Sequence, residues 1–377
     1  MRRCGVRTIV VALVVGVSAL VACAAPAAQP ASAPPAGSGG AGAAKPAAAA
    51  PTTPANPAAA AGPGGAAVEP KPGQPHRIEL GVVALAAYFY PMWVGVDKGF
   101  YAQQGLDVEL TTLQTNEAVA ALVSGSLDIL MCPTDACVTA ISKGGELRMV
   151  NDYLVEAPYN LMARADISTA AGLRDKKIGV SSLSAGTGSL AKIMMRAQGF
   201  GPNDYQLVQA GGNPARFTAL QSGGVDAALL TDPVNFAAML EGYRSLLTFS
   251  QVVPEYSFAS NWVQTSWLND AANREYLVAF QAAQIKAVQW SRDPANKAAF
   301  LDVLVRFAHT TPEIAERIHQ FYVVEKPDIV AVGDLKERPV QTVVDILREW
   351  EDLGPLPPDA AWKDGSYVQQ ARQLAAR

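Results

Sequence analysis

Side chains suited to binding a small molecule are concentrated in a few short stretches of the chain. The aromatic stretch YFY, residues 88–90, could stack a planar ligand and orient its polar groups with phenol hydroxyls. The stretch SSLSAGTGS, residues 181–189, combines hydroxyls with glycines and precedes a predicted helix, whose free amides favour sulfonate, carboxylate or phosphate oxygens. With the loops considered below, they give the predicted ligand-binding residues: Tyr88, Phe89, Tyr90, Thr115, Asn116, Thr134, Asp135, Ser184, Gly186, Thr187, Asp232 and Trp262.

Several of these residues also have a purely structural interpretation. The three rings could pack a helix start into the core, and Thr115, Asn116 and Asp135 stand where side chains cap helix N-termini. Asp232, directly before Pro233, is predicted to cap a helix and also to lie on the cleft side. A carboxylate beside a bound anion costs free energy, so this position favours a zwitterion or a heteroaromatic ring over a small hard anion.

The residue types expected of a catalytic or metal site do not form a recognisable pattern. The histidines His76, His309 and His319 stand apart, and neither His-x-x-x-His nor paired Cys-x-x-Cys occurs. The sequence also has no Gly-x-Ser-x-Gly motif and no phosphate loop. We therefore predict no catalytic residue, no metal and no cofactor. Cys132 and Cys137 are either a disulfide or two small buried thiols.

A repeated phrase indicates how the loops are positioned. ALVSGSLDIL, residues 121–130, returns 98 residues later as ALQSGGVDAALL, residues 219–230, so that Asp128 corresponds to Asp226. Around the first copy, hydrophobic patterning predicts alternating strands (78–83, 106–112, 127–131, 147–151) and helices (91–97, 117–124, 135–143). The second copy repeats this order with strands 177–180, 205–209, 225–230 and 245–249 and helices 189–198, 213–223 and 232–242.

Two such series predict an α/β protein with two lobes of similar build. Alternating strands and helices favour parallel sheets, whose ligand-binding loops follow the carboxyl ends of the strands. We expect lobe 1 to comprise residues 76–160 and 252–377, and lobe 2 residues 161–251. The crossovers would place Glu156, Tyr159 and Trp262 on the hinge side of the cleft. Beyond residue 255 the chain is expected to be mostly helical, with amphipathic runs at 274–290, 296–307 and 339–350.

The N-terminal residues have the composition of an export signal. Basic residues precede the apolar run 9–22, which is short for a membrane span, and the run ends in LVAC. This tetrapeptide resembles a bacterial lipobox, so residues 1–22 are a predicted signal peptide and Cys23 the predicted lipid attachment site; a plain secretory signal is the alternative. Residues 23–75, rich in alanine, proline and glycine, are a predicted disordered tether. The net charge of −4, with charges scattered, argues against nucleic acid as a partner.

A family resemblance adds to these patterns. PMWVGVDKGFYAQQGLDVEL, residues 91–110, contains Lys-Gly-Phe-Tyr at 98–101 and Gly-Leu-Asp-Val at 105–108, and LRDKKIGV follows at 173–180. These motifs resemble substrate-binding lipoproteins of ABC importers in the sulfonate, nitrate, taurine and thiamine-pyrimidine-precursor group. The resemblance extends over residues 77–248 and is specific for the family but weak for the ligand.

The resemblance implies a type II periplasmic-binding-protein fold that closes on a small molecule without altering it. The partners would be the small-molecule ligand, an ABC permease and its ATPase, and the membrane through the lipid anchor; the protein is expected to be an extracytoplasmic monomer. Two alternatives use the same fold: an enzyme of the thiamine-pyrimidine-synthesis type, and a receptor domain that senses its ligand without import.

Overall fold

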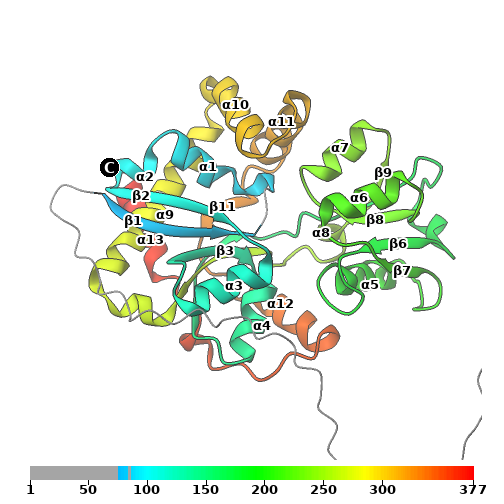
Figure 1. The fold of residues 1–377 in the computed structure, drawn as a ribbon, viewed down its shortest axis with the longest axis horizontal. Coiled ribbons are helices and arrows are strands. Elements are labelled where there is room, and N and C mark those ends of the chain that lie inside the picture. Colours follow the sequence, from blue (N-terminus) through cyan, green and yellow to red (C-terminus); the bar gives the residue numbers. More distant parts are fainter. Residues whose placement is uncertain (1–74, 84–85) are drawn as a thin grey trace, which may run out of the picture. The chain divides into compact units, whose positions relative to one another are not determined.

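The computed structural model describes residues 75–83 and 86–377, all within one compact unit, Ala67–Arg377. The predicted signal peptide, Cys23 and residues 23–74 of the predicted tether lie outside the described residues. Figure 1 shows two separate β-sheets, each accompanied by helices. We call the six-stranded sheet with its helices lobe 1, and the five-stranded sheet with its helices lobe 2.

Lobe 1 is built on a mixed sheet with the strand order β11-β4-β10-β3-β1-β2. Its strands are β1 (His76–Val82), β2 (Leu106–Thr112), β3 (Ile129–Pro133), β4 (Leu147–Leu154), β10 (Ala259–Gln264) and β11 (Val330–Gly333). The first half of the chain supplies the helices α1 (Tyr90–Asp97), α2 (Phe100–Gln103), α3 (Thr115–Ser124) and α4 (Thr134–Ser142). The C-terminal part adds α9 (Ala271–Arg292), α10 (Lys297–Phe307), α11 (Pro312–His319), α12 (Glu337–Trp350) and α13 (Ser366–Ala375).

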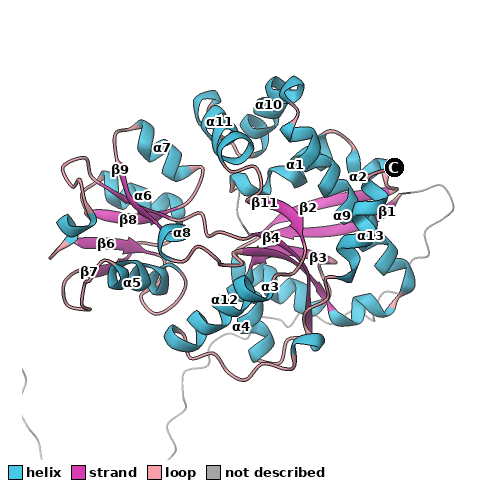
Figure 2. Cartoon of the chain, turned by 180° about the vertical axis from the view of Figure 1, so that it is seen from behind, coloured by secondary structure: helices cyan, strands magenta, loops and turns pink. Residues whose placement is uncertain are grey.

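Lobe 2 repeats the plan on a smaller sheet with the order β7-β6-β8-β5-β9. Its strands are β5 (Asn160–Ala163), β6 (Lys177–Val180), β7 (Gln206–Gln209), β8 (Ala227–Leu230) and β9 (Arg244–Thr248). Its helices are α5 (Thr187–Ala197), α6 (Asn213–Gln221), α7 (Val234–Leu240) and α8 (Phe249–Val252). Figure 2 shows these helices against the strands of the second sheet.

The expectation of wholly parallel sheets is wrong at one strand in each lobe. The chain leaves lobe 1 after β4 and inserts β5 antiparallel between β8 and β9; it returns after α8 and inserts β10 antiparallel between β3 and β4. A strand that enters at the edge where the parallel strands end must run in the opposite direction. The short C-terminal strand β11, also unexpected from the sequence, pairs antiparallel with β4.

The repeated phrase folds into the same local structure in both lobes. The carboxylate Oδ2 of Asp128 accepts a hydrogen bond from the Glu79 amide at 2.9 Å, and that of Asp226 accepts one from the Lys177 amide at the same distance. Gly125 and Gly223 end the preceding helices with φ of 78° and 74°, a left-handed conformation that favours glycine. The repeat therefore preserves a helix stop and a strand-joining carboxylate.

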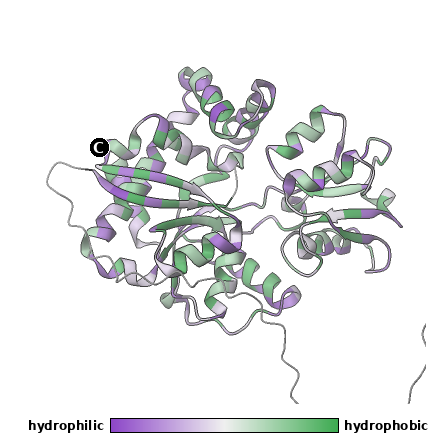
Figure 3. Cartoon of the chain, viewed as in Figure 1, coloured by the Kyte–Doolittle hydropathy of each residue, from purple (hydrophilic) through white to green (hydrophobic). Residues whose placement is uncertain are grey.

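The interior of each lobe follows from the hydrophobic pattern of its strands. In Figure 3, β1 and β2 alternate hydrophilic and hydrophobic residues along their length, and the alternate apolar residues Ile78, Leu80 and Val82 are fully buried. All residues of β8 and three of the four residues of β6 are buried, as expected for strands covered on both faces. Among the described residues, no helix is long and apolar enough to cross a membrane.

Candidate functional site

The most buried charged group at the junction of the two lobes is Asp232, in the loop after β8. Its Oδ1 accepts a hydrogen bond from the Ala87 amide at 3.0 Å, and its Oδ2 accepts one from the hydroxyl of Tyr322. Both donors belong to lobe 1: Ala87 begins the short 3-10 helix after β1, and Tyr322 lies in a π-helical turn, Gln320–Glu325. Loops at the carboxyl ends of both sheets therefore meet at this carboxylate.

This placement corrects one structural expectation for Asp232. The helix α7 begins at Val234 with Pro233 as its N-cap, and no side chain caps it. Asp232 is only 2% exposed, and burial raises the pKa of its carboxyl to about 6, although the hydrogen bonds from Tyr322 and Ala87 oppose the shift. The side chain joins the lobes and does not cap its own helix.

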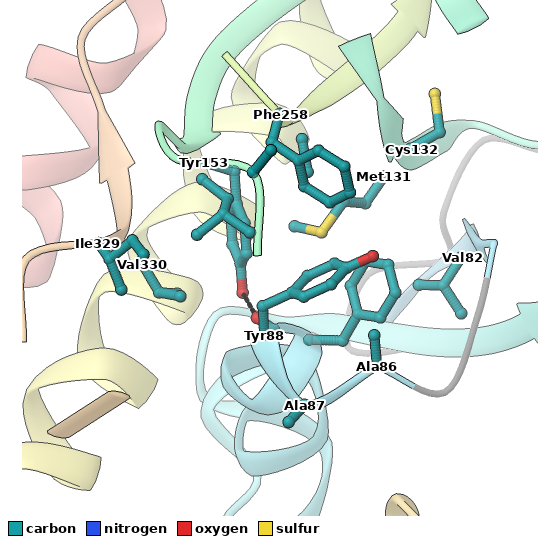
Figure 4. Close-up of a cluster of buried hydrophobic side chains, with 14 of the residues drawn as sticks. Val82, Ala86, Ala87, Tyr88, Met131, Cys132, Tyr153, Phe258, Ile329 and Val330 are labelled. Atoms are coloured by element: carbon teal, nitrogen blue, oxygen red, sulfur yellow. Dashed lines mark hydrogen bonds between the residues drawn. The ribbon is translucent and has the colours of Figure 1, made fainter. Parts of the chain in front are cut away.

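Aromatic side chains surround the same junction. The Tyr88 ring lies 4.5 Å from Phe89 and 5.6 Å, edge-on, from Phe258, between ring centroids. Figure 4 shows Tyr88 next to Phe258, with the hydroxyl of Tyr153 donating to the Tyr88 carbonyl at 3.1 Å. Tyr159 meets the other side of the group, with its ring edge-on to Phe258 at 5.6 Å.

The charges identify which of these rings lie near the carboxylates. Burial is the largest cause of the raised pKa of Tyr88, and the charge of Asp232 is the next. Burial likewise raises the pKa of Tyr159 to about 12, which Arg216 lowers and Asp135 and Asp232 raise. Tyr88 and Tyr159 therefore share an electrostatic environment with both acidic residues.

The loop after β3 supplies Thr134 and Asp135. The Thr134 side chain is fully buried and points into the lobe, where its hydroxyl lies 3.1 Å from Ser257 Oγ and 2.8 Å from Ser260 Oγ. Asp135 Oδ1 accepts from the Ala136 amide at 2.8 Å. Burial, and then the charge of Glu351, raise the pKa of the Asp135 carboxyl to about 6. Asp135 is the acidic group that this loop directs toward the junction.

The loop from Ser181 to Ser189 opens α5 but is already partly occupied. The Thr187 hydroxyl accepts from the Ser181 amide at 2.7 Å, and Ser184 is exposed. Gly186, the N-cap residue of α5, has φ 55°, and its amide donates to Oε1 of Glu351 at 2.9 Å. A carboxylate of the protein itself thus occupies a position expected for a ligand oxygen.

The loop after β2 lies at the same edge of the sheet as Val82, because Val82 is paired with Thr112 at the strand ends. Thr115 and Asn116 form the first turn of α3, whose N-cap is Gln114. The Gln114 amide donates to Glu117 at 3.4 Å, so the cap uses neither predicted residue. In residues 75–83 and 86–377, neither the Thr115 nor the Asn116 side chain makes a hydrogen bond.

Three predicted residues belong to the hydrophobic core. Phe89 and Tyr90 are fully buried, and the Tyr90 ring lies edge-on to Phe300 at 5.2 Å. Trp262 sits in the middle of β10 and stacks on Trp362 at 6.3 Å with an angle of 3° between the rings. The expected hinge position of Trp262 is corrected, because β10 extends this part of the crossover into the sheet.

A comparison with protein families follows from this geometry. The family described as NMT1/THI5 like matches residues 86–297, which is more than half of the chain. The chain belongs to the NMT1/THI5-like family. The matched residues include the aromatic stretch, both acidic loops and the loop before α5.

Known proteins similar to this NMT1/THI5-like chain share its two-lobed plan. YtlA of Bacillus subtilis (strain 168) is 22% identical over 249 residues, 64% of this chain and 73% of YtlA. The periplasmic nitrate-binding protein NrtA from Synechocystis PCC 6803 has a TM-score of 0.64 at 15% identity, covering 80% of this chain and 89% of NrtA. The alkanesulfonate-binding protein SsuA from Xanthomonas axonopodis pv. citri has a TM-score of 0.61 at 15% identity, covering 77% and 99%. These similarities confirm the predicted periplasmic-binding-protein fold.

Three residues of this NMT1/THI5-like protein escaped the sequence analysis as site residues. Tyr322 and Glu351 come from the C-terminal helical part, which has no counterpart in the internal repeat and so no positional signal. Arg216 was noted as a nearby cation, but the structure gives it a different role. Its Nε donates to the Leu229 carbonyl at 2.6 Å and its Nη1 to the Gly211 carbonyl at 2.8 Å, so it braces lobe 2.

Proposed function

We propose that the protein is the extracytoplasmic solute-binding component of an ABC importer, which captures a small polar or heteroaromatic molecule between its lobes and delivers it to a permease. The observation that carries this proposal is the meeting of Asp232 from lobe 2 with Ala87 and Tyr322 from lobe 1. Family membership and the named binding roles of the similar solved proteins support it. The ligand would be released unchanged.

The proposed ligand contacts come from loops of both lobes. Tyr88 would offer a ring face, Asp135 and Asp232 would accept hydrogen bonds, and the backbone near Gly186 would complete the wall. Thr115, Asn116, Thr134, Ser184 and Thr187 remain proposed as nearby polar groups. Phe89, Tyr90 and Trp262 would act indirectly, by holding the loops that carry the contacts.

Movement between the lobes would use the two hinge segments, residues 155–159 and 253–258. These segments lie side by side, since the Tyr256 amide donates to the Val155 carbonyl at 3.3 Å and the Phe258 amide to the Leu154 carbonyl at 2.8 Å. Two short crossing segments allow rotation of one lobe against the other while each sheet stays intact. Closure would exclude water from the ligand, and opening would release it to the permease.

The proposed location is the outer side of the cell membrane, with Cys23 carrying the lipid. Support comes from the apolar run 9–22, the LVAC motif and the composition of residues 23–75. The permease and its ATPase would be the membrane partners, with the binding protein acting as a monomer. Replacing Cys23 by Ala should release the protein from the membrane fraction; persistent membrane association would contradict the anchor.

A thermal-shift screen of the purified full-length chain tests the binding role. We expect one class among sulfonates, pyrimidines, flavin-like rings, amines and amino-acid derivatives to raise Tm, because a ligand at 100 times its Kd stabilises the folded state by about 2.7 kcal/mol. Asp232→Asn should reduce that shift. The absence of any shift across the screen would refute small-molecule capture.

A further inference from the structure

The end of α12 clasps the start of lobe 2's longest helix, α5. Besides the 2.9 Å contact between Glu351 and the Gly186 amide, Arg196 of α5 forms an ion pair with Glu349 at 2.5 Å. The Arg196 guanidinium also lies 4.8 Å from the centre of the Trp350 ring. Three consecutive residues of lobe 1 thus hold α5, and one of them places a negative charge at the amide end of the helix.

The position of Glu351 matters because helix N-termini attract anions. The free amides and the helix dipole at such an end stabilise a carboxylate, a sulfonate or a phosphate alike. With Glu351 seated there, a second anion would have to displace it or bear its repulsion. The side chain is held in place by its own short connection to α12, whose last helical residue is Trp350.

Two further carboxylates act on the same group of rings. The pKa of Tyr256 is raised by burial and then by Asp135, Tyr159 and Glu351. Asp232 contributes to the raised pKa of Tyr88 and of Tyr159. Acidic groups from the loop after β3, the loop after β8 and the end of α12 therefore converge on one aromatic cluster, which consists of Tyr88, Tyr159, Tyr256 and Phe258.

The cations near this cluster are engaged elsewhere. Arg216 is 3% exposed and directs its donors to Leu229, Gly211 and, at 3.4 Å, to the Asn213 side-chain oxygen. Arg196 is paired with Glu349. An incoming anion would thus meet carboxylates before it met a guanidinium with spare donors.

We propose that Glu351 determines ligand specificity: it fills the anion position at α5, and the cleft accepts an organic cation, a protonated or quaternary amine carried on a flat ring. This inference rests on the proposed binding function and narrows it. A cation would be attracted by the carboxylates of Asp135, Asp232 and Glu351. It would also gain from the aromatic faces, where cation–π contacts contribute about 0.5–2 kcal/mol. The similar proteins named for nitrate and alkanesulfonate would differ from this chain in that respect.

A matched pair of probes separates charge from shape. Benzyltrimethylammonium and benzenesulfonate carry opposite charges on the same ring, and their binding to the full-length chain is measured by titration calorimetry and thermal shift. We expect the cation to bind and the sulfonate not to bind. Glu351→Ala should weaken the cation about tenfold and allow measurable sulfonate binding, since removal of one nearby charge commonly changes affinity by that order.

Two variants control for the fold of the clasp. Glu351→Gln keeps an oxygen for the Gly186 amide but removes the charge, and it should weaken the cation as Glu351→Ala does. Glu349→Ala removes the ion pair with Arg196 and should leave the ratio of cation to sulfonate affinity unchanged. An equal change in that ratio for Glu349→Ala would overturn the specific role of Glu351.

The remaining outcomes separate this inference from the proposed function. Binding of benzenesulfonate to the unaltered chain as tight as that of benzyltrimethylammonium overturns the inference and leaves solute capture standing. A screen in which only sulfonates or only neutral molecules raise Tm has the same meaning. If no small molecule of any charge binds, the proposed function itself fails.

Discussion

The hydroxyl of Tyr322 donates a hydrogen bond to Oδ2 of Asp232, and the two residues are 90 positions apart in different lobes. Tyr322 is fully buried, and its raised pKa results first from burial and then from the adjacent Asp232 charge. With the Ala87 amide on Oδ1, both oxygens of this carboxylate are satisfied from lobe 1. This contact joins the lobes at the proposed ligand site.

Tyr322→Phe removes the hydroxyl and leaves one buried carboxylate oxygen without its donor. We expect the free energy of unfolding to fall by about 1–3 kcal/mol, the usual cost of an unsatisfied buried polar group. Chemical denaturation measures the change. Tyr90→Phe is the matched control, because Tyr90 is equally buried and its hydroxyl has no partner within the part of the chain described. Equal losses in both variants would contradict a specific role for the Tyr322 contact.

The raised pKa of Asp232, about 6 against an ordinary value of 3.8, makes stability depend on pH. Because the folded state binds the proton more tightly than the unfolded state, the contribution is fully present below about pH 4 and is lost as pH rises through about 6. It is worth up to about 3 kcal/mol. Asp135, whose pKa is also raised to about 6, adds in the same direction.

We therefore expect Asp232→Asn to flatten the pH dependence of the unfolding free energy between pH 4 and pH 7.5. Denaturant titrations at several pH values measure this slope for the original chain and the variant. The exposed Asp107, replaced by Asn, serves as the control and should leave the slope unchanged. A variant at position 232 with the original slope would show that another group sets the pH dependence.

The sulfur atoms of Cys132 and Cys137 lie 2.6 Å apart, and both residues are free and fully buried. We expect this pair to close to a disulfide in protein isolated from an oxidising compartment. Alkylation in denaturant without reductant should then leave both residues unlabelled, and reduction should lower the free energy of unfolding by about 2 kcal/mol for so short a loop. Full labelling without reductant would show that they remain thiols.

The internal repeat made the double architecture predictable, and Asp128 and Asp226 show why. A carboxylate after a glycine helix stop has one local task, which is to bind the amide of the neighbouring strand, and both copies perform it at 2.9 Å. Such short-range chemistry can be read from neighbouring residues. The order of strands and helices in the repeated region followed from the same local patterns.

Contacts between distant parts of the chain could not be predicted in this way. Glu351 reaches Gly186 across 165 residues, and neither residue carries a pattern that names the other. The sequence also gave no sign that β5 and β10 would be exchanged between the sheets, because a short apolar run does not specify its direction. Trp262 was consequently expected at the hinge and lies in the core instead.

Hydrogen–deuterium exchange of the full-length chain, with and without a ligand that raises its Tm, tests the central claim of two-lobed capture most directly. We expect the ligand to protect amides in both lobes together, in residues 86–92 and 132–137 of lobe 1 and in residues 181–189 and 229–234 of lobe 2. Protection confined to one lobe, or located away from these loops, would contradict capture between the lobes.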